Sequence, residues 1–149
     1  MNRSLTNRGL SRFDRAMPKA SAFQSQALAL LRIVAGYMFT LHGAQKIVGA
    51  FGGLGGHTAE PFTLMWFAGI LEIVGGPLII LGLLTRPVAL ILCGEMAVGY
   101  FMVHIHLGPP LLPLLNMGEI TVMNCFFFLY LVTTGPGAFS LDGLIFKKR

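Results

Sequence analysis

Four long apolar stretches limit what this chain can fold into more than any other feature of its sequence. They run over residues 27–48, 62–84, 87–104 and 115–134. Each is near the ~20 residues that a helix needs to cross a ~30 Å hydrocarbon core. A bilayer offers no water to backbone N–H and C=O groups, so such segments must be helical. The sequence therefore predicts an all-α membrane protein.

The charged residues are too few for a soluble domain. Only 11% of the 149 residues are charged and 54% are hydrophobic, whereas a soluble domain carries about 25% charged residues. A globule of this length would lack a surface compatible with water. Embedding in a bilayer removes that requirement.

Short connections join the four stretches. A glycine-rich loop covers residues 51–61, a tight turn covers 85–87, and 105–114 form the third connection. Such loops favour antiparallel neighbours, so residues 26–149 are predicted to form an up-down-up-down four-helix bundle. We expect Gly36, Gly69, Gly82 and Gly94 to permit close helix contacts.

The basic residues indicate how the bundle is oriented. They concentrate in a basic arm (residues 1–25), at Arg86 and in the C-terminal Lys-Lys-Arg, with Lys46 as the exception. Basic residues favour the cytoplasmic side, so both termini are predicted to be cytoplasmic in a multi-pass protein of the bacterial inner membrane. Because these residues flank apolar segments, they indicate membrane lipids as partners and no nucleic acid.

Three ionisable residues fall at the inner and middle levels of the predicted bundle. Arg32, Glu72 and Glu95 lie within apolar stretches, where a lone charge costs ~3 kcal/mol or more. We expect Arg32 to pair with Glu95 or Glu72. The remaining carboxyl group is then either protonated or faces a polar cavity. A structural network that fixes helix register and a functional proton or ligand site both fit this pattern.

A second polar group falls at the outer level. His42, Lys46, His104 and Glu119 are the candidates for an outer polar site, while His57 and His106 are interpreted as solvated loop residues. Imidazoles beside a carboxylate can relay protons or hydrogen-bond a quinone or an oxyanion. No metal site is predicted, because no single helix carries an HxxxH or HxxE spacing.

The two cysteines lie inside apolar stretches. Cys93 and Cys125 form no CxxC motif. Buried, unreactive thiols are therefore the expected interpretation.

Three motifs together resemble the DoxX family of small bacterial membrane proteins. They are LRIVAGYMFTLHGAQKI (31–47), LEIVGGPLIILGLLTRPVAL (71–90) and GPGAFSLD (135–142), and the resemblance covers about residues 27–143. It implies a four-helix membrane protein similar to subunits of thiosulfate:quinone oxidoreductase or to partners in membrane oxidoreductase complexes. The polar positions that match the family pattern are Arg32, His42, Gly43, Lys46, Glu72 and Asp142.

The last of these motifs also has a structural interpretation. Ser140 or Asp142 is predicted to cap a short interfacial helix. Asp142 is also a candidate to hold Arg86 at the inner surface.

Three functions remain open at this stage. The first is a membrane subunit of an oxidoreductase system, in which a quinone or a small sulfur or oxygen species approaches the outer polar site. The second is a transporter or permeability pathway for a small molecule, proton or ion along Arg32, Glu95, Glu72 and His42, with Pro77 as a hinge. The third is a scaffold or assembly partner without chemistry of its own. The cofactor is unknown, with quinone as a candidate. The expected partners are oxidoreductase subunits or further copies of the chain.

Overall fold

The structure, a computed structural model, describes residues 23–146 of the 149. Its helices are α3 (Gln24–Val48), η1 (Ala50–Gly52), α4 (Leu64–Leu81), α5 (Thr85–Met102), η2 (His104–His106), α6 (Glu119–Thr134) and α7 (Leu141–Ile145). The described part is thus built from helices, turns and loops, which agrees with the predicted all-α class. Nearly all of the predicted basic arm lies outside the described residues, as do the last three residues of the chain.

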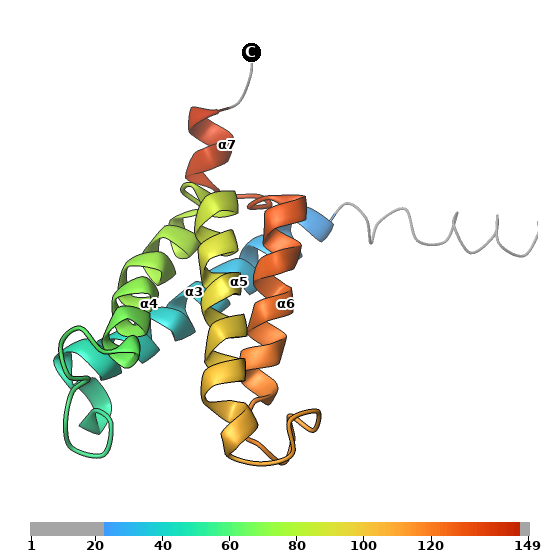
Figure 1. The fold of residues 1–149 in the computed structure, drawn as a ribbon. Coiled ribbons are helices and arrows are strands. Elements are labelled where there is room, and N and C mark those ends of the chain that lie inside the picture. Colours follow the sequence, from blue (N-terminus) through green and yellow to red (C-terminus); the bar gives the residue numbers. More distant parts are fainter. Residues whose placement is uncertain (1–22, 147–149) are drawn as a thin grey trace, which may run out of the picture.

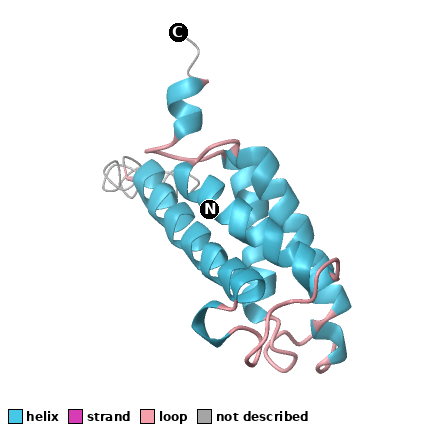
Figure 2. Cartoon of the chain, turned by 90° about the vertical axis from the view of Figure 1, so that its left-hand side faces the viewer, coloured by secondary structure: helices cyan, strands magenta, loops and turns pink. Residues whose placement is uncertain are grey.

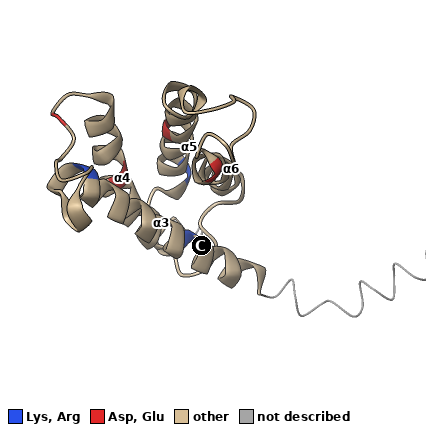
Figure 3. Ribbon diagram, turned by 90° about the horizontal axis from the view of Figure 1, so that it is seen from below, with Lys and Arg blue, Asp and Glu red and all other residues tan. Residues whose placement is uncertain are grey.

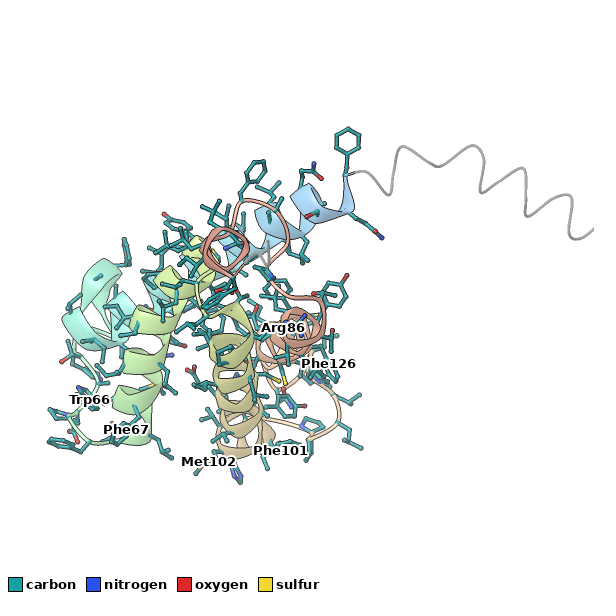
Figure 4. All side chains as sticks on the ribbon, turned by 90° about the horizontal axis from the view of Figure 1, so that it is seen from above. Trp66, Phe67, Arg86, Phe101, Met102 and Phe126 are labelled. Atoms are coloured by element: carbon teal, nitrogen blue, oxygen red, sulfur yellow. The ribbon has the colours of Figure 1, made fainter. Side chains whose placement is uncertain are left out.

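Three of the helices are long and apolar enough to cross a membrane. They are Gln24–Val48, Leu64–Leu81 and the continuous segment Thr85–His106, whereas α6 is a shorter apolar helix. The outer surface is covered by large apolar side chains such as Phe101 and Phe126, both 65% exposed (Figure 4). Hydrocarbon, not water, suits such a surface. The chain is a membrane protein with three candidate spans.

The starts of α5 and α6 differ from those predicted. α5 begins at Thr85, before Pro87, because proline is tolerated in the first helical turn, where its missing N–H would have no helical partner. α6 begins at Glu119 instead of residue 115. The Asn116 side-chain oxygen accepts from Gly118 N at 3.0 Å. This contact holds the residues before α6 in a turn.

The four long helices form two pairs. α3 packs on α4 and α5 packs on α6, while α4 and α5 touch each other less. Figure 1 shows that α5 and α6 lie side by side and that α3 crosses behind. α4 and α5 meet near α7 and diverge toward the opposite end. We call these two ends the α7 end, where the α4–α5 turn also lies, and the loop end, where η1 and the α5–α6 connection lie (Figures 1 and 2).

Glycines bring α3 and α4 into close contact. A Cβ atom on Gly36 would meet the backbone oxygen of Gly76, and one on Gly43 would meet the backbone of Ile73. Small residues at such positions let two backbones approach, as membrane helices require. The predicted close contacts are confirmed for Gly36 and Gly69.

The other two glycines differ from each other. A Cβ atom on Gly82 would meet the Arg32 guanidinium of α3 and Ser140, so the close contact predicted there is confirmed, whereas the one predicted for Gly94 is wrong. Gly82 ends α4 in the left-handed conformation, with φ 64°, which glycine adopts without steric cost. Gly94 has open space where a Cβ atom would stand.

A small apolar core joins the two pairs. Its buried members come from all four long helices: Phe39, Ile79, Ala89, Leu92, Phe128 and Leu131. The rings of Phe39 and Phe128 meet edge to face with centroids 4.7 Å apart, a favourable aromatic geometry. This core closes the bundle between the cavity described below and the α7 end.

Arg32 holds the α7 end together through backbone carbonyls. Its fully buried guanidinium donates to the oxygens of Ile79 and Ile80 at 2.5 and 2.6 Å, and to those of Pro136 and Phe139 at 2.8 and 3.0 Å. The predicted ion pair of Arg32 with Glu72 or Glu95 is therefore wrong. The last turn of a helix leaves carbonyl groups without helical N–H partners. Carbonyls at the end of α4 and in the segment after α6 therefore accept the hydrogen bonds of this guanidinium.

Asp142 caps α5 instead of holding Arg86. Its carboxylate accepts from the N–H groups of Leu84 and Thr85 at 2.7 and 2.8 Å, at the start of α5. Within residues 23–146, Arg86 is exposed and makes no ion pair with Asp142. The predicted cap of the short helix is confirmed, because Ser140 Oγ accepts from Gly143 N at 3.2 Å.

Candidate functional site

A cavity of about 650 Å³ lies at the loop end, where α4 and α5 diverge. All four long helices contribute to its wall, which is mostly apolar. Phe67 of α4 and Met102 of α5 line it from opposite sides, and Figure 4 shows them across the gap between these helices. Ligand sites of this kind combine an apolar wall with a few polar groups.

An ion pair crosses one wall of the cavity. Lys46, in the last turn of α3, donates to both carboxylate oxygens of Glu72 on α4 at 2.5 and 2.6 Å. The two side chains are only 16% and 5% exposed. Figure 3 shows the basic position of α3 against the acidic position of α4. Because the charges compensate each other, the pair places polarity in the wall without a net charge.

Glu95 on α5 lines the same cavity but has no partner. Both of its carboxylate oxygens are buried, and no group among the described residues hydrogen-bonds to them. Buried polar atoms are nearly always hydrogen-bonded, so each exception needs an explanation. Glu95 is thus a cavity-lining residue whose carboxyl group lacks a hydrogen-bond partner, and a change of its side-chain rotamer would present that group to a ligand.

Two histidines complete the polar part of the wall. His42 on α3 is exposed to the cavity. His104 is held in place: its Nδ1 lies 3.1 Å from the backbone oxygen of Asn116, and its Nε2 lies 3.0 Å from the Thr121 hydroxyl. A carbonyl oxygen only accepts, so Nδ1 carries a proton, and in the neutral ring Nε2 accepts from Thr121. His42 is therefore the histidine that remains available to a ligand.

Asn116 organises the connection beside His104, a role that the sequence did not indicate. It is fully buried, and its amide donates to the Tyr100 hydroxyl and the Pro109 oxygen, both at 3.1 Å. Tyr100 in turn donates to the oxygen of Pro110 at 2.6 Å. These contacts fold the connection against α5 and so position His104.

The structure merges the two polar groups predicted from the sequence. His42, Lys46 and His104 of the outer group share the cavity with Glu72 and Glu95 of the inner group. Side chains on a helix point back toward its N-terminus, so the long Lys46 side chain reaches the deeper level of Glu72. Two predicted members do not contribute: Arg32 belongs to the α7 end, and Glu119 lies exposed in the first turn of α6.

Metal ligands do not gather in the described part of the chain. No group of three His, Cys, Asp or Glu side chains within residues 23–146 is placed to hold an ion.

The two cysteines, which the sequence indicated only as separate buried thiols, lie together. Cys93 of α5 and Cys125 of α6 place their sulfur atoms 3.7 Å apart. They are 32 residues apart in the sequence, so only the pairing of α5 with α6 brings them into contact.

Comparison with known proteins identifies the family. Residues 27–105 match the sequence model of the DoxX family, which is more than half of the chain. The chain belongs to the DoxX family. The match contains the first two of the three sequence motifs, and it confirms the predicted family.

Relatives from bacteria match different shares of the chain. An uncharacterized protein of Haemophilus influenzae is 42% identical over 136 residues, which are 89% of this chain and all of that protein. Inner membrane protein YqjF of Escherichia coli is 38% identical over 79 residues, 53% of this chain and 59% of that protein.

A third relative carries a name that bears on chemistry. The Bacillus subtilis protein named "Putative oxidoreductase CatD" is 26% identical over 122 residues, 80% of this chain and 87% of that protein. No solved structure matches the chain. The described cavity is therefore the main guide to the function of this DoxX protein.

Proposed function

We propose that this DoxX protein is a membrane subunit of an oxidoreductase system and that a quinone headgroup binds in the cavity between α4 and α5. The observation that carries the proposal is the unpartnered Glu95 carboxyl group in a mostly apolar cavity of about 650 Å³. The name of the Bacillus subtilis relative, "Putative oxidoreductase CatD", supports the same class.

The chemistry of a quinone fits the polar groups of this wall. A quinone is flat, uncharged and soluble in lipid, and its two carbonyl oxygens accept hydrogen bonds. The carboxyl group of Glu95 in its neutral form and the ring N–H of His42 can each donate one hydrogen bond to these oxygens. Lys46 is already committed to Glu72. Apolar side chains such as Phe39 and Phe67 surround the remaining volume.

The charge of the cavity favours a neutral ligand over a sulfur oxyanion. Glu72 neutralises Lys46, and no other Lys or Arg of residues 23–146 lines the cavity. An anion that entered would find no free lysine or arginine to compensate its charge. Burying an uncompensated charge costs several kcal/mol. Quinone is therefore the better supported of the ligands considered.

The membrane arrangement forms part of the proposal. We place the α7 end at the cytoplasmic face of the bacterial inner membrane, together with both termini, because Arg86 and the basic terminal segments favour that side. α6 then makes the fourth crossing, and the cavity lies toward the outer face. Partner subunits would supply the redox centre that the subunit requires, and further copies of the chain would complete an oligomer.

Quinone binding to the purified protein in lipid nanodiscs tests this function. Removing one hydrogen-bonding group loses about 0.5–1.5 kcal/mol, so Glu95→Leu and His42→Ala should each weaken quinone affinity by about 2- to 13-fold. Glu95→Gln keeps a donor and should weaken it less.

Two matched variants control for general damage. Glu119→Leu removes an exposed carboxylate outside the cavity, and His57→Ala removes an exposed loop histidine. Both should bind quinone as the wild type does. Equal affinity in the cavity variants and the controls, or no bound quinone in any of them, would remove the proposal.

The transport and scaffold alternatives receive less support. The proposed polar path begins at Arg32, but that guanidinium is enclosed by backbone carbonyls and lies apart from the cavity. Proton flux into liposomes that is faster for wild type than for Glu72→Gln would revive transport. Co-purification of a protein with a redox centre would favour the oxidoreductase subunit over a scaffold.

A further inference from the structure

Cys93 and Cys125 form a pair of thiols that the proposed quinone site does not use. Their sulfur atoms are 3.7 Å apart, and Cys125 Sγ also lies 3.5 Å from the backbone oxygen of Cys93. Both cysteines are free and half-buried. They are the chain's two cysteines, so each thiol has the other as its partner within the protein.

The position of the pair restricts what can react with it. Cys93 is eight residues after the start of α5 at Thr85, which places it about 12 Å along the helix at 1.5 Å per residue. In the membrane arrangement proposed above, hydrocarbon surrounds the bundle at that depth. Charged or strongly polar oxidants do not dissolve there, whereas a lipid-soluble quinone does.

The pair lies beside the cavity wall. Met96, one helical turn after Cys93, and Asn124, which precedes Cys125, both line the cavity. Neither sulfur atom lines it. Met96 is unbranched and can change its conformation easily. A quinone in the cavity therefore approaches the α5–α6 contact that holds the two sulfur atoms.

We propose that Cys93 and Cys125 are a redox-active dithiol that a membrane quinone oxidises to a disulfide linking α5 to α6. This inference rests on the proposed function and specifies where the electrons come from. Two S–H bonds break and one S–S bond forms. The two electrons and two protons that leave the thiols convert the quinone to its hydroquinone, so the step is balanced.

Disulfide formation requires only a small movement. The sulfur atoms must approach from 3.7 Å to the ~2.05 Å of a disulfide. The helices that carry them are already packed together. The oxidised form covalently joins the two helices that build one side of the cavity.

Thiol counting in lipid nanodiscs tests the inference directly. The reduced protein is incubated without oxygen with decylubiquinone, whose ring is fully substituted and forms no lasting adduct at an open carbon. Free thiols are then counted with a maleimide after denaturation, and hydroquinone is followed by absorbance. We expect both thiols to disappear, the intact mass to fall by two hydrogen atoms, and one hydroquinone to form per protein.

Single variants and a second oxidant make the result decisive. Cys93→Ser and Cys125→Ser should each keep one thiol and form no hydroquinone. Diamide, an azo compound that oxidises neighbouring dithiols, shows whether the sulfur atoms can join. Disulfide with diamide but not with quinone, or with neither, overturns the inference.

Quinone binding distinguishes the two proposals. If quinone still binds but the thiols stay reduced, the dithiol inference fails and the proposed function stands. If no quinone binds to the wild type, both fail.

Discussion

Removing both partners of the ion pair between Lys46 and Glu72 should destabilise the protein less than the two single removals added together. Lys46→Met leaves a buried carboxylate without its cation, and Glu72→Met leaves a largely buried ammonium without its anion. The double variant replaces both charges with apolar side chains of similar length. We therefore expect the double variant to lose less stability than the sum of the losses of the two single variants, and the difference is the coupling energy of the pair.

The size of the coupling follows from the two hydrogen bonds in the pair. Breaking a buried pair in a water-soluble protein costs 3–5 kcal/mol. In membranes the unfolded helices also find polar partners, so measured couplings average ≈ 0.6 kcal/mol and reach ≈ 1.7 per hydrogen bond. Lys46 makes two contacts to Glu72, at 2.5 and 2.6 Å. The membrane values apply here and give a coupling of about 1–3 kcal/mol.

Reversible unfolding by denaturing detergent measures this coupling. Trp66, the chain's single tryptophan, lies in α4 against Phe62 and Phe67 and reports the loss of packing. Lys46→Met combined with Glu119→Gln is the control cycle and should be additive within about 0.3–0.5 kcal/mol. A coupling for Lys46 and Glu72 no larger than this control would refute the reasoning.

Two further predictions concern the backbone. Gly43→Ala places a Cβ atom against the backbone of Ile73 and should lower the free energy of unfolding by about 1–3 kcal/mol. Gly94→Ala, where the space is open, should leave the free energy of unfolding equal or higher. The same detergent titration checks both variants, and equal losses would contradict the close contact at Gly43. Asp142→Ala removes the acceptor of two N–H groups at the start of α5 and should cost about 0.5–2 kcal/mol. Asp142→Asn keeps an acceptor and should cost less. Thermal unfolding in detergent measures both, and an asparagine variant that loses as much stability as the alanine variant would show that charge, not capping, matters.

The cavity shows why depth along a helix was an incomplete guide to the site. Counting residues placed Lys46 and Glu72 at different levels, yet their side chains meet because a lysine spans more than one helical turn. The same counting placed Arg32 near Glu95, but it could not weigh backbone carbonyls as competing acceptors. Charged side chains can be identified directly in a sequence. Carbonyl groups that are free to accept a hydrogen bond can be identified only when the structure shows where each helix ends. This explains why the partner of Arg32 was predicted wrongly.

The sequence by itself determined that this chain is helical and lies in a membrane, because apolar length and missing charge are properties of the composition along the chain. It also determined the family, through motifs that are local in the sequence. The tertiary structure alone decided which polar groups meet, since the divergence of α4 from α5 opens the cavity that gathers Glu72, Glu95 and His42. It likewise decided that Cys93 meets Cys125. Contacts between distant residues depend on how helices cross and rotate, and packing of side chains in three dimensions sets those angles.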